Sequence, residues 1–104
     1  MIQVLTREEV QQKLSNKETF ILDFYADWCG PCRMLGQNLT ALLSEEKDFP
    51  IYKFDIEADR EFAVQHGVRS IPFLKFFKEG EDFKQKVGMV SNQIIKEEYQ
   101  SMLN

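Results

Sequence analysis

The sequence has few cysteines that could cross-link the chain and no long apolar segment that could insert into a membrane. Of its 104 residues, two are cysteine, three are proline, and histidine and tryptophan occur once each. No apolar run approaches the length of a membrane span, and no basic segment leads into an apolar stretch near the start. We therefore expect neither a transmembrane helix nor a secretory signal. A cytoplasmic location is the expectation, and in that reducing setting a cysteine pair is more often catalytic or metal-binding than structural.

Positive charge is also scarce, and it is scattered along the chain. Thirteen Lys and Arg residues stand against seventeen Asp and Glu residues, for a net charge of −4. Without a basic cluster, neither nucleic acid nor an anionic membrane surface is an expected partner. Hydrophobic residues make up 43% of the chain and charged residues 29%, as in ordinary globular proteins. Residues 1–104 should form one domain that needs no disulfide or metal to fold.

Hydrophobic periodicity predicts alternating strands and helices. Thr6 and Glu9 fit a capping box that opens a helix ending near Asn16. Segments that are apolar on both faces indicate buried strands, and apolar residues at helical spacing indicate helices. The expected strands are 20–26, 51–56 and a hairpin of 73–77 with 83–87, and the expected further helices are 31–46, 58–66 and 91–102. With one further strand before the helix that Thr6 opens, the order β-α-β-α-β-α-β-β-α implies an α/β domain: a central mixed sheet of about five strands, with helices on both faces.

Cys29 and Cys32 lie where a buried strand is expected to end and a helix to begin. Helix N-termini stabilise anions, and Cys-x-x-Cys motifs lower a cysteine pKa from about 8.5 toward 7. This matters because only the thiolate attacks a disulfide. The three-residue offset puts the two Cα atoms about 5 Å apart, within disulfide range. Pro31 suits the first helical position, and Gly30 leaves room for a bulky substrate. Together these features predict a redox-active pair.

Other uses of the cysteines follow from the residues alone and remain open at this stage. A zinc half-site would need two more ligands, and His66 is the only other His or Cys. A merely structural disulfide is a second possibility, and a partner-binding scaffold without redox chemistry is a third. The phenylalanines at 54, 62, 73, 76 and 77 are expected in the core rather than around a cofactor.

The segment Trp28-Cys29-Gly30-Pro31-Cys32 resembles the active site of the thioredoxin family at every position. The resemblance extends to Asp23-Phe24 upstream, Ile71-Pro72 downstream and Gly88 after the last strand. It covers essentially the whole chain in the same order, and it implies the thioredoxin fold. It also implies an enzyme that binds no cofactor or metal and uses a Cys29–Cys32 disulfide.

Two charged residues in the predicted strands receive roles from this resemblance. Asp23 stands in an apolar strand, where burial should raise the pKa of its carboxyl group. The family assigns this position to proton transfer toward the resolving Cys32. Lys53, at the matching position of the neighbouring strand, would adjust the pKa of Asp23. The alternatives are an Asp that reaches solvent at a strand edge and a Lys whose stem merely covers apolar surface.

The resemblance also points to a substrate-binding surface. It implies a cis bond between Ile71 and Pro72, and a backbone before the proline that pairs with an extended client segment. Trp28 would be a partly exposed platform beside the attacking sulfur rather than a core residue. Gly88 would lie on the docking surface, although a simple turn would also explain this glycine.

Several positions depart from the family pattern. Gln37, preceded by Gly36, stands where many thioredoxins have a helix-kinking proline, so local flexibility is expected in place of the kink. Phe73 follows the expected cis-proline where Thr is common. Tyr25 replaces a common Trp, and Ser70 a common Gly. The departure at Gln37 bears on redox potential or stability, whereas the other three leave the chemistry intact and bear on partner recognition.

The sequence thus predicts a protein-disulfide reductase. Cys29 would attack a client disulfide, and Cys32, deprotonated with help from Asp23, would resolve the mixed disulfide. The chain has no glycine-rich nucleotide fingerprint, so a separate thioredoxin reductase would recharge it. We expect disulfide-containing client proteins as partners and a monomeric state. A disulfide oxidase or isomerase is the alternative activity on the same fold.

Overall fold

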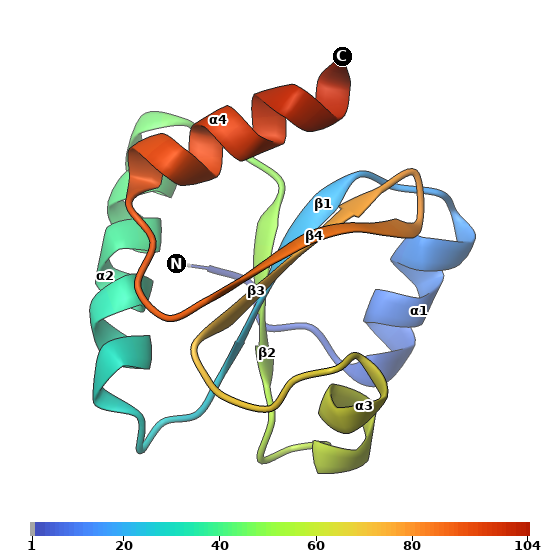
Figure 1. Cartoon of the computed structure of the whole chain (residues 1–104), viewed down its shortest axis with the longest axis vertical. Coiled ribbons are helices and arrows are strands. Elements are labelled where there is room, and N and C mark those ends of the chain that lie inside the picture. Colours follow the sequence, from blue (N-terminus) through green and yellow to red (C-terminus); the bar gives the residue numbers. More distant parts are fainter. Residues whose placement is uncertain (1) are drawn as a thin grey trace.

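The computed structural model describes residues 2–104 and shows a mixed sheet with helices on both faces (Figure 1). The strands are β1 (Phe20–Tyr25), β2 (Ile51–Asp55), β3 (Phe73–Lys78) and β4 (Glu81–Val87), and the helices are α1 (Arg7–Ser15), α2 (Gly30–Glu45), α3 (Arg60–Gln65) and α4 (Asn92–Leu103). The strand order is β2-β1-β3-β4. β1 and β2 are parallel, whereas β3 is antiparallel to both β1 and β4.

The sheet separates two apolar cores, because successive side chains of a strand point to opposite faces. Along β1, Leu22 and Phe24 pack with Val10 of α1 and Phe62 of α3 on one face. On the other face, a second cluster joins β1 and β3 to α2 and α4 through Ile21, Leu35, Leu39, Leu74 and Ile95. The alternation explains why β1 is apolar on both faces, apart from Asp23. The five phenylalanines expected in the core are all buried.

The sequence prediction of about five strands is wrong: the sheet formed by the described residues has four. Next to β2, the N-terminal segment makes only an isolated parallel bridge between Val4 and Lys53. Lys53 accepts from the Leu5 amide at 2.8 Å and donates to the Gln3 carbonyl at 3.0 Å. The pairing stops there because Thr6 turns the chain into α1, where its side chain and that of Glu9 complete the expected capping box.

The other predicted boundaries all agree with the structure to within two residues. Ser91 caps α4 by accepting from the Ile94 amide, and Gly67 follows α3 with φ of +81°, the left-handed conformation that favours glycine. Over residues 2–104, no helix combines the length and apolar character that crossing a membrane requires.

Candidate active site

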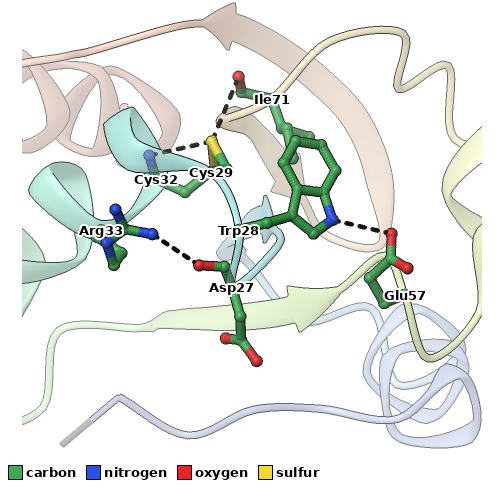
Figure 2. The surroundings of a disulfide bond; sticks show 7 residues. All are labelled: Asp27, Trp28, Cys29, Cys32, Arg33, Glu57 and Ile71. Carbon is green, nitrogen blue, oxygen red and sulfur yellow. Dashed lines mark hydrogen bonds between the residues drawn. A yellow bond between two sulfur atoms is a disulfide. The ribbon is translucent and has the colours of Figure 1, made fainter.

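The two cysteines form a disulfide at the start of α2, just beyond the C-terminal end of β1 (Figure 2). Cys29 is the N-cap residue, and its Sγ atom accepts a 3.2 Å hydrogen bond from the Cys32 amide. The Cα atoms are 5.2 Å apart, as the three-residue offset predicts. Both are buried, but Cys29 keeps 6% of its surface exposed and Cys32 only 1%. Cys29 is therefore the sulfur that a client can reach.

The loop before β3 covers the disulfide from the other side. The Ile71–Pro72 bond is cis, the isomer that the family resemblance implies. The Ile71 carbonyl oxygen lies 3.9 Å from Cys29 Sγ. Figure 2 shows this oxygen pointing toward the sulfur. Gly88 donates its amide to the Pro72 carbonyl at 2.8 Å, which ties the end of β4 to this loop. The structure thus brings Ile71, Pro72 and Gly88 together next to the cysteines.

Trp28 lies on the surface beside Cys29 with 64% of its area exposed, so it is not a core residue. Its Nε1 atom donates a 3.2 Å hydrogen bond to the Glu57 carboxylate (Figure 2). The same carboxylate also pairs with Arg60. Sequence reasoning missed Glu57. No local pattern marks it, because the contact joins the loop after β1 to the loop after β2, 29 residues apart.

Asp23 is fully buried in β1, and neither carboxylate oxygen has a hydrogen-bond partner among the described residues. An ionised carboxylate without partners is costly in an apolar interior. Burial therefore raises the pKa of Asp23 from 3.8 to about 7, although the positive charge of Lys53 opposes the shift. A group with such a pKa can take or release a proton near neutral pH. Asp23 is therefore buried, as expected, and does not reach solvent at a strand edge.

Lys53 is the direct neighbour of Asp23 in the β1–β2 register. Its Nζ atom lies 4.0 Å from the centre of the Tyr25 ring and faces α2 at Gly36, where a Cβ atom would be 3.5 Å away. Lys53, Tyr25 and Gly36 line an open cavity of about 410 Å³, and Gln37 lines the same cavity. Two departures from the family pattern, Tyr25 and Gln37, therefore line the same cavity as Lys53. α2 runs through both Gly36 and Gln37 without a break.

His66, the remaining candidate metal ligand, lies on the opposite side of the sheet from α2. Its ring packs against Phe24, Phe62 and Phe77, and its Nδ1 atom is 3.2 Å from the Lys75 ammonium. Within residues 2–104, no three His, Cys, Asp or Glu side chains are arranged to hold a metal ion. The described side chains therefore provide no ligand set to complete a Cys29–Cys32 zinc site.

Comparisons with known proteins agree with this geometry. A model of the Thioredoxin family matches residues 1–101. The chain belongs to the thioredoxin family. A thioredoxin from Mycoplasmoides gallisepticum is 32% identical over 97 residues, which cover 93% of this chain and 97% of that protein. A thioredoxin from Chlamydia trachomatis is 38% identical over 89 residues, 86% of each chain.

Solved structures give the same result for the fold. A mutant thioredoxin from Halobacterium salinarum superposes with a TM-score of 0.85 at 32% identity, covering 99% of this chain and 90% of that one. Mitochondrial thioredoxin 3 from Saccharomyces cerevisiae, in its oxidised form, superposes with a TM-score of 0.81 at 26% identity. Thioredoxins are thiol–disulfide oxidoreductases that use a redox-active disulfide and no other cofactor. With the Cys29–Cys32 disulfide at the family's position, this chain is a thiol–disulfide oxidoreductase.

Proposed function

We propose that this thioredoxin reduces disulfides of client proteins, with Cys29 as the attacking and Cys32 as the resolving residue. The observation that carries the proposal is the placement of Cys29 Sγ. It caps a helix, accepts from the Cys32 amide, and is the more exposed of the two sulfurs. An amide donor and the positive end of a helix both stabilise a thiolate, which is the attacking species.

The exchange proceeds in two steps. The Cys29 thiolate attacks one client sulfur, which becomes bonded to Cys29 while the other client sulfur leaves as a thiolate and takes a proton from solvent. The Cys32 thiol then gives its proton to the Asp23 carboxylate and attacks Cys29 Sγ, releasing the second client thiolate. Two electrons pass from the cysteine pair to the client. The products are the Cys29–Cys32 disulfide and a client dithiol.

Asp23 and Lys53 have the properties that this proton transfer needs. The pKa of Asp23 is raised to about 7, so the carboxyl group can accept a proton at neutral pH and return it later. The Lys53 charge keeps that pKa from rising further. Because Asp23 contacts no described hydrogen-bond donor, a water molecule is the proposed carrier between its carboxylate and Cys32.

The proposal includes the surroundings in which the protein works. A separate thioredoxin reductase recharges the disulfide, since the sequence has no glycine-rich nucleotide fingerprint. The protein acts as a monomer in the cytoplasm, where the reducing poise favours the dithiol. Trp28, Ile71, Pro72 and Gly88 form the surface on which clients dock. The Gly30-Pro31 dipeptide supports reduction rather than oxidation or isomerisation.

Trapping with a Cys32→Ser variant tests the assignment of the two sulfurs. Without a resolving thiol, client mixed disulfides should accumulate on Cys29, whereas Cys29→Ser should trap none. Equal trapping by both variants would overturn the roles. The direction of electron transfer is tested by measuring the reduction potential of the Cys29–Cys32 pair at equilibrium with a dithiol buffer. A reductase should have a potential of about −270 mV, and a potential above about −200 mV would favour an oxidase or isomerase. A protein that serves only as a scaffold would keep its biological activity in a Cys29→Ser, Cys32→Ser double variant.

A further inference from the structure

Two neighbouring cavities flank the loop that approaches Cys29, and among the described residues only arginines contribute charge to their lining. The first cavity, about 500 Å³, lies between Trp28, α3 and Ile71. The second, about 400 Å³, lies between the loop and the end of β4 at Val87. Arg69 lines both cavities, and no Asp or Glu among the described residues lines either. In a chain with net charge −4, this is a local reversal of charge.

The two arginines of this region are in different states. The Arg60 guanidinium is paired with the Glu57 carboxylate, which also accepts from Trp28. Arg69 is exposed and makes no ion pair with any residue from 2 to 104. A guanidinium presents a planar fork of donors that fits a carboxylate with two hydrogen bonds. Arg69 is therefore the free carboxylate-binding group beside the first cavity.

We propose that Arg69 makes this thioredoxin prefer client segments with an acidic residue close to the disulfide. This inference rests on the proposed function, because it needs clients to bind along the Ile71 loop and react at Cys29. The apolar wall of the first cavity would take a neighbouring apolar side chain, and Arg69 would pair with the Asp or Glu. The occupant is an extended, acidic segment of another protein.

The chain geometry places the acidic residue. The Ile71 carbonyl lies 3.9 Å from Cys29 Sγ, and Arg69 precedes Ile71 by two residues. An extended client advances about 3.3 Å per residue, so two residues of this loop match two or three residues of the client. The carboxylate that meets Arg69 therefore belongs within three residues of the client cysteine.

The test uses synthetic peptides whose single cysteine carries 2-mercaptoethanol in a mixed disulfide. Pairs of peptides differ only by Glu or Gln at each position up to three residues from the cysteine. The pre-reduced protein is mixed with each peptide, and the second-order rate constant is taken from acid-quenched samples. In each turnover the cysteine pair gives two electrons to the peptide disulfide and releases peptide thiol and 2-mercaptoethanol. The rate with dithiothreitol alone corrects for the intrinsic effect of Glu on the disulfide.

We expect the wild-type protein to reduce the Glu peptide about 1.5 to 5 times faster than the Gln peptide for at least one position, the range of an exposed ion pair. The ratio should fall toward one in about 1 M salt, where the screening length is about 3 Å. Arg69→Gln should bring the ratio to about one, and Arg69→Lys should keep part of it. Lys47→Gln removes the same charge beyond the far end of α2, and it should keep the full preference.

The outcomes separate this inference from the proposal on which it rests. Reduction of the uncharged 2-hydroxyethyl disulfide at equal rates by wild type and Arg69→Gln supports the reductase function independently of charge. If the wild-type protein fails on that compound, the proposed function fails. If it succeeds but shows no preference for Glu, or if the preference survives in Arg69→Gln, the role of Arg69 is wrong. Loss of the preference for Glu in Arg60→Gln, with Arg69 intact, would also overturn the role of Arg69.

Discussion

The Lys75 ammonium donates a 2.9 Å hydrogen bond to the His66 carbonyl and lies 3.2 Å from Nδ1 of the same residue. His66 caps the C-terminal end of α3, so a cation buried in β3 meets the negative end of a helix. Asp82 of β4 reaches the same ammonium at 3.2 Å. This group holds α3 against the sheet immediately before the loop that carries Ile71 and Pro72.

The first prediction concerns the protonation of His66. Burial, and then the charge of Lys75, lower its pKa below the ordinary value of 6.5, while Asp82 opposes the shift. Lys75→Met should therefore raise the pKa of His66, and Asp82→Asn should lower it further. His66 is the single histidine of the chain, so its imidazole resonances can be followed by NMR without assignment of others. An unchanged titration in Lys75→Met would show that the two side chains are not coupled.

The same shift makes stability depend on pH. A histidine with a lowered pKa in the folded state binds protons more readily when unfolded, so its stabilising contribution is present above about pH 6.5 and is lost as the pH falls. Compared by urea unfolding, wild type should lose stability relative to His66→Asn between about pH 7.5 and 5. Each unit of pKa shift corresponds to about 1.4 kcal/mol. A constant difference between the two proteins would contradict this prediction.

The second prediction is that Asp23→Asn stabilises the oxidised protein, and does so increasingly as the pH rises. The pKa of Asp23 is raised from 3.8 to about 7 by burial, so folding favours the neutral acid. Stability is thus lost as the pH rises from about 4 to 7, in total about 4 kcal/mol at most. Asn cannot ionise and escapes this loss. Denaturant unfolding at several pH values should show the free-energy gap between variant and wild type growing with pH.

The contribution of other titrating groups cancels in that comparison, because both proteins share them. A gap that shrinks with rising pH would show that Asp23 is stabilised as a carboxylate. The same variant should slow release of client from the mixed disulfide, since the proposed acceptor of the Cys32 proton is gone.

The third prediction assigns the tuning role of Lys53. Its positive charge lowers the pKa of Asp23 against the effect of burial. Lys53→Met keeps much of the side-chain volume and removes the charge, so it should raise the pKa of Asp23. The carboxyl carbon of Asp23 reports this directly by NMR of the oxidised protein. Lys84→Met, on the β4 surface with its ammonium paired to Glu98, removes a charge elsewhere and should leave Asp23 unchanged.

Much of the site could be predicted from the sequence because it follows local rules. A cysteine pair at a three-residue offset after a strand reaches disulfide range in any helix N-terminus. Asp23 could be assigned to the interior because the residues around it are apolar on both faces. The four strands and the caps at Thr6, Gly67 and Ser91 follow from the same kinds of local pattern.

The features that sequence reasoning missed depend on long-range contacts. No local pattern shows that the ammonium of Lys75, in the mostly apolar strand β3, is satisfied by His66, nine residues earlier, and by Asp82 on the next strand. Glu57 meets Trp28 only because two loops at the same sheet edge approach each other. The expected fifth strand did not form, because the described residues before α1 make one isolated bridge, between Val4 and Lys53.

The fourth prediction concerns Gly36, which departs from the family pattern together with Gln37. Gly36 lies inside α2, where Gly costs about 0.5–1 kcal/mol relative to Ala. A Cβ atom there would meet Lys53 Nζ at 3.5 Å, an ordinary contact with the end of a flexible side chain. Gly36→Ala should therefore stabilise the protein by about 0.5–1 kcal/mol in urea unfolding. The missing side chain at Gly36 leaves room for the Lys53 ammonium and does not stabilise the helix.

Gly67→Ala is the matched control for that substitution. Nothing lies within 4 Å of the Cβ position at Gly67, but its φ of +81° is unfavourable for any residue with a side chain. This variant should lose about 1–2 kcal/mol, so the same chemical change has opposite signs at the two sites. Gly36→Leu goes further, because its larger side chain must displace the Lys53 ammonium. It should raise the pKa of Asp23 in the same direction as Lys53→Met, and an unchanged Asp23 titration in Gly36→Leu would show that α2 does not set the position of that charge.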